Sequence, residues 1–297
     1  MRVTPPGADT ASSSTSSKVV LITGAAHGIG ECTARRLCSH GYRVALTDID
    51  PRVLTVAQSL GDGARGWVAD LVDPEAVAGL VKAAHAAWGR LDGIVNNAAF
   101  QRERADVVAE PIAVWERVIN VCLRAPFLMA KYGVPLMMRQ GAGAIVNVSS
   151  IHALRAYPHS PAYDTAKAGL NGFTRQIVLE YGAYGIRANS VLPGLIIESE
   201  ASPEQIAHYP VGRVGRPEDV ASVIEFLLDD ALSGFISGAE ISVDGGLMAY
   251  SPEVRPPQPP LHPATSSASS LEASLPPSQD IPGPGDQRAA ADDDSAH

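Results

Sequence analysis

The stretch VVLITGAAHGIG, residues 19–30, decides the fold. Its four leading apolar residues have the length of a short buried strand, which Thr23 and Gly24 close. A glycine-rich turn follows, and a helical pattern runs from Ile29 to His40 before Gly41 stops it. A strand that passes through a tight turn into a helix is the opening of a parallel α/β unit.

The rest of the chain repeats this alternation of apolar runs and helical patterns. Further strands are expected at 44–46, 66–69, 93–95, 144–148, 187–192 and 240–243, and further helices at 53–60, 74–88, 115–138, 160–184 and 217–229. Right-handed crossovers then give a parallel sheet covered on both faces. We predict one α/β domain over residues 18–250, with a doubly wound sheet of about seven strands and helices on both faces.

Composition bounds the remaining possibilities. Residues 1–17 and 251–297 are rich in Ser, Pro and Ala without apolar periodicity, so we expect both to be disordered. The net charge is −9 with no basic run, which argues against nucleic acid as a partner. No window is apolar enough for a membrane span, and residues 1–17 have no secretory core. The three cysteines lack metal-like spacing, so we expect no metal and a cytoplasmic location.

The glycine-rich turn is the first candidate binding element. Its spacing is G-x-x-x-G-x-G, over Gly24, Gly28 and Gly30. Glycine lets a backbone approach a ligand closely, and the N-terminus of the next helix favours a pyrophosphate. The alternative is a bare strand-to-helix turn with no ligand. His27 is interpreted as a loop side chain near phosphate rather than a catalytic group.

Asp48 ends the second expected strand, 18 positions after Gly30. An acidic residue there reaches the adenosine ribose hydroxyls and repels a 2′-phosphate, so NAD is favoured over NADP. The alternative is that Asp48 caps the next turn, and Arg52 lies near enough to accept a phosphate. Asp70 and Leu71, at the end of the third strand, are interpreted as bordering the adenine, with helix capping by Asp70 as the alternative.

Tyr163 and Lys167 form the candidate catalytic pair. They lie four residues apart in an expected helix and therefore on one face of it. A cation beside a phenol favours the phenolate, and such a phenol can transfer a proton near neutral pH. The alternative is an ordinary Tyr-Lys pair on an amphipathic helix.

Together the motifs resemble the short-chain dehydrogenase/reductase family in its single-domain branch. They are TGAAHGIG at 23–30, Asp48, Asp70, NNAA at 96–99, Asn120, Ser150, YDTAK at 163–167, RANSVLPG at 187–194, GRVGRPEDVA at 212–221 and SVDGG at 242–246. The resemblance spans residues 18–248 in the family's order. It implies a Rossmann-like fold, and an NAD(H)-dependent oxidoreductase that interconverts a secondary alcohol and a ketone.

The resemblance also implies residue roles. Tyr163 is the general acid/base, Lys167 favours its ionised form and binds the nicotinamide ribose, Ser150 binds the substrate oxygen, and Asn120 holds a proton-relay water. The implied cofactor contacts are Gly24, His27, Gly28, Ile29, Gly30, Asp48, Asp70, Leu71, Asn97, Ala98, Tyr163, Lys167, Pro193, Gly194 and Ile196. Candidate substrate-lining residues are His152, Leu154, Tyr157 and Leu195.

Two positions depart from the family pattern. Ala99 stands where the family usually has Gly, and Glu198 stands where it usually has a Thr that touches the diphosphate. Glu198 is expected to weaken cofactor binding or to turn toward the substrate.

The tripeptide Ser-Ile-His at 150–152 is similar to some sugar and polyol dehydrogenases of the family. The alternatives are an NADPH-dependent 3-oxoacyl carrier-protein reductase and a non-catalytic NAD-binding scaffold. Family members commonly pair their long helices, so a homodimer or homotetramer is expected, with a small molecule as substrate.

Overall fold

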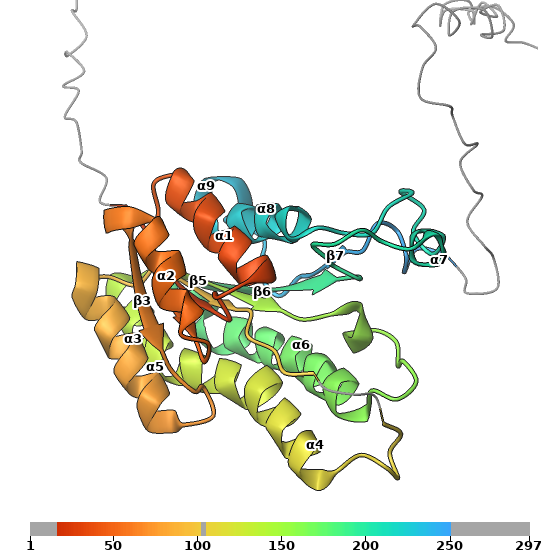
Figure 1. Cartoon of the computed structure of the whole chain (residues 1–297). Helices are drawn as coiled ribbons and strands as arrows, with labels where there is room; N and C mark the ends of the chain where they lie inside the picture. Colours follow the sequence, from red (N-terminus) through yellow and green to blue (C-terminus); the bar gives the residue numbers. More distant parts are fainter. Residues whose placement is uncertain (1–16, 102–104, 251–297) are drawn as a thin grey trace, which may run out of the picture. The chain divides into compact units, whose positions relative to one another are not determined.

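The computed structural model describes residues 17–101 and 105–250, and the expectation of disordered ends concerns residues outside these ranges, apart from Ser17. One sheet organises the described chain (Figure 1). Its strands are β1 (Val19–Thr23), β2 (Arg43–Asp48), β3 (Ala64–Val68), β4 (Gly93–Asn96), β5 (Gly143–Val148), β6 (Ile186–Pro193) and β7 (Glu240–Val243). All pair in parallel, in the spatial order β3-β2-β1-β4-β5-β6-β7. The predicted doubly wound sheet of seven strands is confirmed.

Helices cover both faces of this sheet, as Figure 1 shows. One face carries α1 (Gly28–Ser39), α2 (Arg52–Ser59) and α8 (Pro217–Leu228), and the opposite face carries α3 (Pro74–Trp88), α5 (Ala125–Gln140) and α6 (Pro161–Tyr181). Helix α4 (Ile112–Ile119) packs on α6, and α7 (Pro203–Ile206) and α9 (Asp230–Ser233) are single turns. Short 3₁₀ turns lie at Gly61–Gly63, Ile151–Ala153 and Gly182–Tyr184.

Strand β1 shows why the apolar runs are continuous rather than alternating. Val20 and Ile22 belong to the core on the α1 side, whereas Leu21 belongs to the core on the α3 side. Both faces of the strand are therefore buried, as in parallel sheets with helices on each side. From β1 the sheet grows through β2 and β3 on one side and through β4 to β7 on the other side. The switch point between β1 and β4 is where doubly wound sheets bind ligands.

The expected helix over 115–138 is interrupted in the structure. Residues Asn120–Arg124 form a π-helical segment between α4 and α5, and Ala125 donates its N–H to the Asn120 carbonyl, five residues back. Pro126 has no N–H with which to continue the regular ladder, which gives a physical reason for the irregular turn. Such π segments occur often at functional sites, and this one contains Asn120.

Within residues 17–101 and 105–250, no helix is long and apolar enough to cross a membrane.

Candidate active site

The glycine-rich turn packs closely against the end of β4. Gly24 has φ +64°, and a Cβ there would lie 2.8 Å from Ala98 Cα, while a Cβ on Gly30 would lie 2.1 Å from the Gly24 carbonyl oxygen. Gly28 also has a positive φ, +58°, but nothing lies within 4 Å of its Cβ position. The turn is therefore packed at Gly24 and Gly30 and open at Gly28, the first residue of α1. This open helix N-terminus fits the pyrophosphate of a dinucleotide.

Hydrogen bonds from Asn97 hold the turn in place. Its side-chain N–H₂ donates to the carbonyl oxygens of Thr23, at 3.0 Å, and Gly24, at 2.9 Å. The Thr23 hydroxyl accepts the backbone N–H groups of Asn97 and Ala98, each at 3.0 Å. Asn97 and Ala98 thus lie against the turn, and Thr23 contributes a support that the sequence prediction did not include.

Asp48 lies where β2 ends, and its two carboxylate oxygens accept different backbone N–H groups. Oδ2 accepts from Ala26 in the glycine-rich turn and Oδ1 accepts from Asp50, both at 3.0 Å. The turn-capping role considered as an alternative is therefore present. Asp48 as a whole residue is 9% exposed, and its carboxylate lies beside the open turn. A carboxylate there fits ribose hydroxyls.

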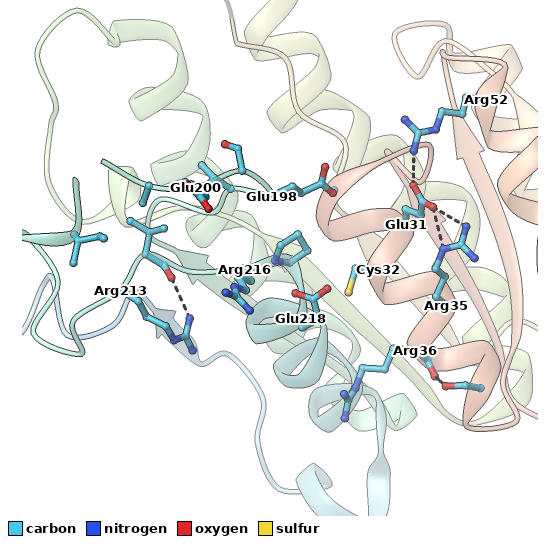
Figure 2. A pocket seen from close by; sticks show the side chains of 18 of the residues that line it. Glu31, Cys32, Arg35, Arg36, Arg52, Glu198, Glu200, Arg213, Arg216 and Glu218 are labelled. Carbon is cyan, nitrogen blue, oxygen red and sulfur yellow. Dashed lines mark hydrogen bonds and ion pairs between the residues drawn. The ribbon is translucent and has the colours of Figure 1, made fainter. Parts of the chain in front are cut away.

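The side chain of Arg52 is paired with an acidic residue of α1. Its Nη2 donates to Glu31 Oε2 at 3.0 Å, and Glu31 Oε1 accepts from Arg35 at 2.7 and 3.0 Å. Figure 2 shows Glu31 between the two guanidinium groups. Arg52 is thus held by a carboxylate on α1.

A cavity of about 1220 Å³ opens beside the glycine-rich turn (Figure 2). It extends along α1 and the start of α8, and the segment after β6 forms another wall. Glu198 lines the same cavity as Gly28, together with Glu31, Glu200 and Glu218. Burial, followed by the charge of Glu218, raises the pKa of the Cys32 thiol in this cavity to about 11. The cavity wall therefore carries charges of both signs, because these carboxylates are joined by the guanidinium groups of Arg35, Arg36, Arg52, Arg213 and Arg216.

Asp70 does not cap the following helix. Helix α3 is capped by Asp73, which accepts the N–H of Glu75, so the capping alternative is wrong. Asp70 instead accepts from Val72 N–H at 3.1 Å and from Arg117 Nη1 at 3.0 Å. Burial raises its pKa, but these two donors outweigh burial and leave the pKa below its usual value. The side chain of Leu71 is buried in the core on the α3 side.

Lys167 and Tyr163 lie together on α6. The Lys167 side chain is 2% exposed and its Nζ donates to the Val148 carbonyl oxygen at 2.7 Å. The same Nζ lies 5.4 Å from the centre of the Tyr163 ring. Helical spacing thus brings the cation to the phenol, as predicted from the two residues.

The two serines after β5 have different contacts. Ser149 Oγ donates to the Lys167 carbonyl oxygen at 3.2 Å, which ties it to α6. Ser150 Oγ accepts the N–H of His152 at 3.2 Å and begins the turn Ile151–Ala153. This difference supports the choice of Ser150 rather than Ser149 as the substrate-binding serine.

Asn120 enters the site on the π-helical segment. Val118 and Cys122, on either side of it in sequence, pack with Ala162 and Ala166 of α6. The segment therefore lies against the turn of α6 that carries Tyr163.

Of the expected substrate-lining residues, His152 and Tyr157 lie beside the candidate catalytic phenol. The His152 ring stacks on Tyr157 at 4.0 Å and meets the Tyr163 ring edge-on at 5.4 Å. Leu154 is 47% exposed, and Leu195 donates its N–H to the Tyr209 hydroxyl at 2.8 Å.

Pro193, the last residue of β6, is buried, and beyond the strand Ile196 packs on the core of the α1 side. A Cβ on Gly194 would lie 3.2 Å from Asp244 Cα, so this segment is also closely packed.

Sequence reasoning missed Asp164, whose Oδ1 lies 2.5 Å from His152 Nδ1. The signal was available, because Asp164 directly follows Tyr163, but the sequence did not show that the loop folds back onto it.

Comparison with known proteins agrees with this geometry. A family model described as Enoyl-(Acyl carrier protein) reductase matches residues 24–248. The chain is 40% identical over 242 residues to cis-4-hydroxycyclohexanecarboxylate dehydrogenase of Sinomonas cyclohexanicum, covering 78% of this chain and 97% of that protein. It is also 40% identical over 237 residues to cyclohexanol dehydrogenase of Acinetobacter sp. (strain SE19), covering 77% and 94%.

A 3-oxoacyl-[acyl-carrier-protein] reductase of Thermotoga maritima is 36% identical over 242 residues, covering 78% of this chain and 98% of that protein. The solved structure entitled "Crystal structure of gox2181" superposes with a TM-score of 0.74 at 29% identity, covering 79% of this chain and 96% of that one. The chain therefore belongs to the short-chain dehydrogenase/reductase family and is an NAD(P)-dependent oxidoreductase acting on CH–OH groups.

Proposed function

We propose that this enzyme uses NAD(H) to interconvert a ring-bearing secondary alcohol and its ketone, with Tyr163 as the acid/base. The observation that carries the proposal is the position of Lys167 Nζ. It lies 5.4 Å from the centre of the Tyr163 ring and donates to the carbonyl at the end of β5. The ring-bearing substrate class is supported by two relatives, which are named for dehydrogenation of cyclohexanol and of a hydroxycyclohexanecarboxylate.

The residue roles follow from what each group can donate or accept. In alcohol oxidation, Tyr163 as phenolate takes the hydroxyl proton, and Ser150 donates a hydrogen bond to the developing alkoxide. Lys167 holds a positive charge beside the phenol and reaches the nicotinamide ribose. Asn120 positions a water for proton exchange. NAD bound at this site would supply the hydride acceptor.

The proposed cofactor-binding residues form groups, each assigned to one part of the dinucleotide. Gly24, His27, Gly28, Ile29 and Gly30 would hold the pyrophosphate at the turn, and Asp48 would bind the adenosine ribose. Asp70 and Leu71 would border the adenine, Leu71 through its backbone because its side chain is in the core. The nicotinamide end would be held by Asn97, Ala98, Pro193, Gly194 and Ile196.

The preference for NAD is supported by charge. Asp48 places a carboxylate beside the turn, where it would repel a 2′-phosphate, and the Arg52 guanidinium is paired with Glu31. A 3-oxoacyl carrier-protein reductase remains the second candidate because a relative carries that name. The family model description also points to acyl carrier-protein chemistry.

Turnover of purified protein tests the proposal. We expect oxidation of cyclohexanol-type alcohols with NAD to exceed oxidation of sugars and polyols, and reduction of 3-oxoacyl thioesters with NADPH to be slow. Fluorescence titration should give a lower Kd for NADH than for NADPH, and Asp48→Ala should narrow that difference. Fast 3-oxoacyl reduction with NADPH would establish the second candidate instead.

A further inference from the structure

A second constellation adjoins the Tyr163 phenol and has no part in the chemistry described so far. It consists of His152 and Tyr157, in the loop after Ser150, and of Asp164, in the first turn of α6. The side chains of His152 and Asp164 are 13% and 14% exposed, so water reaches their contact poorly. A hydrogen bond in such surroundings holds its partners more firmly than one at an open surface.

Both oxygens of the Asp164 carboxylate bind the loop. Oδ1 lies 2.5 Å from His152 Nδ1, and Oδ2 accepts the N–H of Tyr157 at 2.7 Å. One carboxylate thereby joins two points of the loop to the helix. Because the carboxylate accepts at Nδ1, that nitrogen carries a proton, and the tautomer and the plane of the ring are fixed together.

His152 contacts Tyr163 through its ring and Ser150 through its backbone. The imidazole and the Tyr163 ring meet edge-on, with centroids 5.4 Å apart and planes at 85°, and the imidazole stacks on Tyr157. The backbone N–H of His152 donates to Ser150 Oγ at 3.2 Å. Asp164 is the immediate neighbour of Tyr163, so the same helical turn sets the position of the imidazole and of the phenol.

We propose that His152 is a positioning residue: its imidazole, oriented by Asp164, fixes the Tyr163 phenol for reaction, while its backbone N–H holds the Ser150 hydroxyl. The proposal rests on the function proposed above, because that function gives the Tyr163 phenol and the Ser150 hydroxyl their roles. Small displacements of reacting groups cost large factors in rate, so loss of the imidazole is expected to lower kcat more than it raises KM.

Three variants separate the ring from its hydrogen bond. His152→Asn keeps a donor for Asp164 and removes the ring that contacts Tyr163. His152→Phe keeps a flat ring and removes the Nδ1 donor. Asp164→Asn keeps the imidazole and weakens its hydrogen bond to residue 164. The matched control is His159→Asn, an exposed histidine of the same loop with φ +61°, a conformation that Asn tolerates.

Steady-state kinetics are measured with NAD and the best alcohol of a panel that includes cyclohexanol. We expect kcat to decrease in the order wild type, His152→Phe, His152→Asn, with a loss of roughly 10- to 100-fold for His152→Asn. The Kd for NADH should stay unchanged, and the isotope effect on kcat with carbinol-deuterated alcohol should increase. His159→Asn should match the wild type. Wild-type kcat and isotope effect in His152→Asn, with only a lower Tm, would overturn the proposal.

Nuclear magnetic resonance of ¹⁵N-histidine protein tests the geometry without turnover. We expect a strongly downfield proton on His152 Nδ1 that disappears in Asp164→Asn and persists in His159→Asn. Absence of that signal in the wild type would overturn the proposal. If Tyr163→Phe retained activity, the proposed function would fail; an inactive Tyr163→Phe beside a fully active His152→Asn would sink only this inference.

Discussion

The Lys167 ammonium donates a 2.7 Å hydrogen bond to the carbonyl oxygen of Val148, the last residue of β5. This bond joins the helix that carries Tyr163 to the strand that leads to Ser150. The ammonium is almost fully buried, and its charge lies close to the phenol. The Lys167 side chain thus both fixes α6 to β5 and places a positive charge near the Tyr163 phenol.

Replacing Lys167 with Met should affect cofactor binding as well as turnover. The variant keeps an unbranched chain but removes the ribose contact, so we expect the Kd for NADH to rise roughly tenfold, equivalent to about 1.4 kcal/mol. Leaving the buried Val148 carbonyl without its donor should also cost about 1–3 kcal/mol of unfolding free energy. Fluorescence titration and urea unfolding measure the two effects. Ser150→Ala serves as control, since it should lower turnover and leave NADH affinity intact; equal NADH affinity in Lys167→Met would refute the ribose role.

Glu198 should weaken binding of the dinucleotide. It lines the cavity that opens at Gly28, where a pyrophosphate is expected, and a carboxylate there repels phosphate (Figure 2). Replacement with Thr removes the charge and adds a donor, so the Kd for NADH should fall roughly fivefold, or about 1 kcal/mol, and less at high salt. Glu200→Thr, in the same cavity, should change the Kd less. Weaker binding by Glu198→Thr would show that Glu198 faces elsewhere.

The thiol of Cys32 should be slow to alkylate at ordinary pH. Because burial and Glu218 raise its pKa to about 11, the reactive thiolate is scarce below that pH. At pH 8 we expect iodoacetamide to modify Cys32 about 100-fold more slowly than an ordinary thiol, with the rate rising until the pH nears 11. Peptide mass spectrometry gives the rate at this residue. Glu218→Gln should accelerate the reaction; a rate that levels off near pH 8 would contradict the assignment.

Exposed apolar side chains on the outer helices predict self-association. On α5 and α6, Phe127 is 47% exposed and Leu179 is 80% exposed, and Phe127 meets Phe173 edge-on at 6.0 Å. We propose that these helices pair in a homodimer or homotetramer. Light scattering at micromolar concentration should give two or four times the chain mass of 31.0 kDa. Leu179→Glu should lower the measured mass toward that of a single chain. A monomeric wild type would refute this.

Much of the fold follows from local sequence signals. Pro74 and Gly89 delimit α3 at the predicted residues, because proline suits the first turn of a helix and glycine adopts the left-handed conformation after the last. The strand at Glu240–Val243 also has its predicted bounds. Glycine spacing likewise predicted the turn between β1 and α1, where Gly24 and Gly30 have room only for hydrogen.

The features that the sequence did not predict depend on tertiary contacts. An apolar pattern cannot distinguish a regular helix from one that carries a π segment at Asn120, because both place similar residues on the core side. The pairing of His152 with Asp164 depends on a loop returning to the helix, and helical or strand periodicity carries no information about it. The candidate site residues were therefore proposed from motifs, whereas the contact between His152 and Asp164 was not predicted.

The most direct test of the account is the effect of Tyr163→Phe on kcat/KM for the alcohol that the wild type oxidises best. The substitution removes one oxygen and keeps the ring that contacts His152, so Tm and NADH affinity should hardly change. We predict a loss in kcat/KM of at least the roughly 10²- to 10⁴-fold expected for removal of a positioned proton-transfer group. A variant that keeps most of the wild-type kcat/KM would contradict the assignment of Tyr163 as the acid/base.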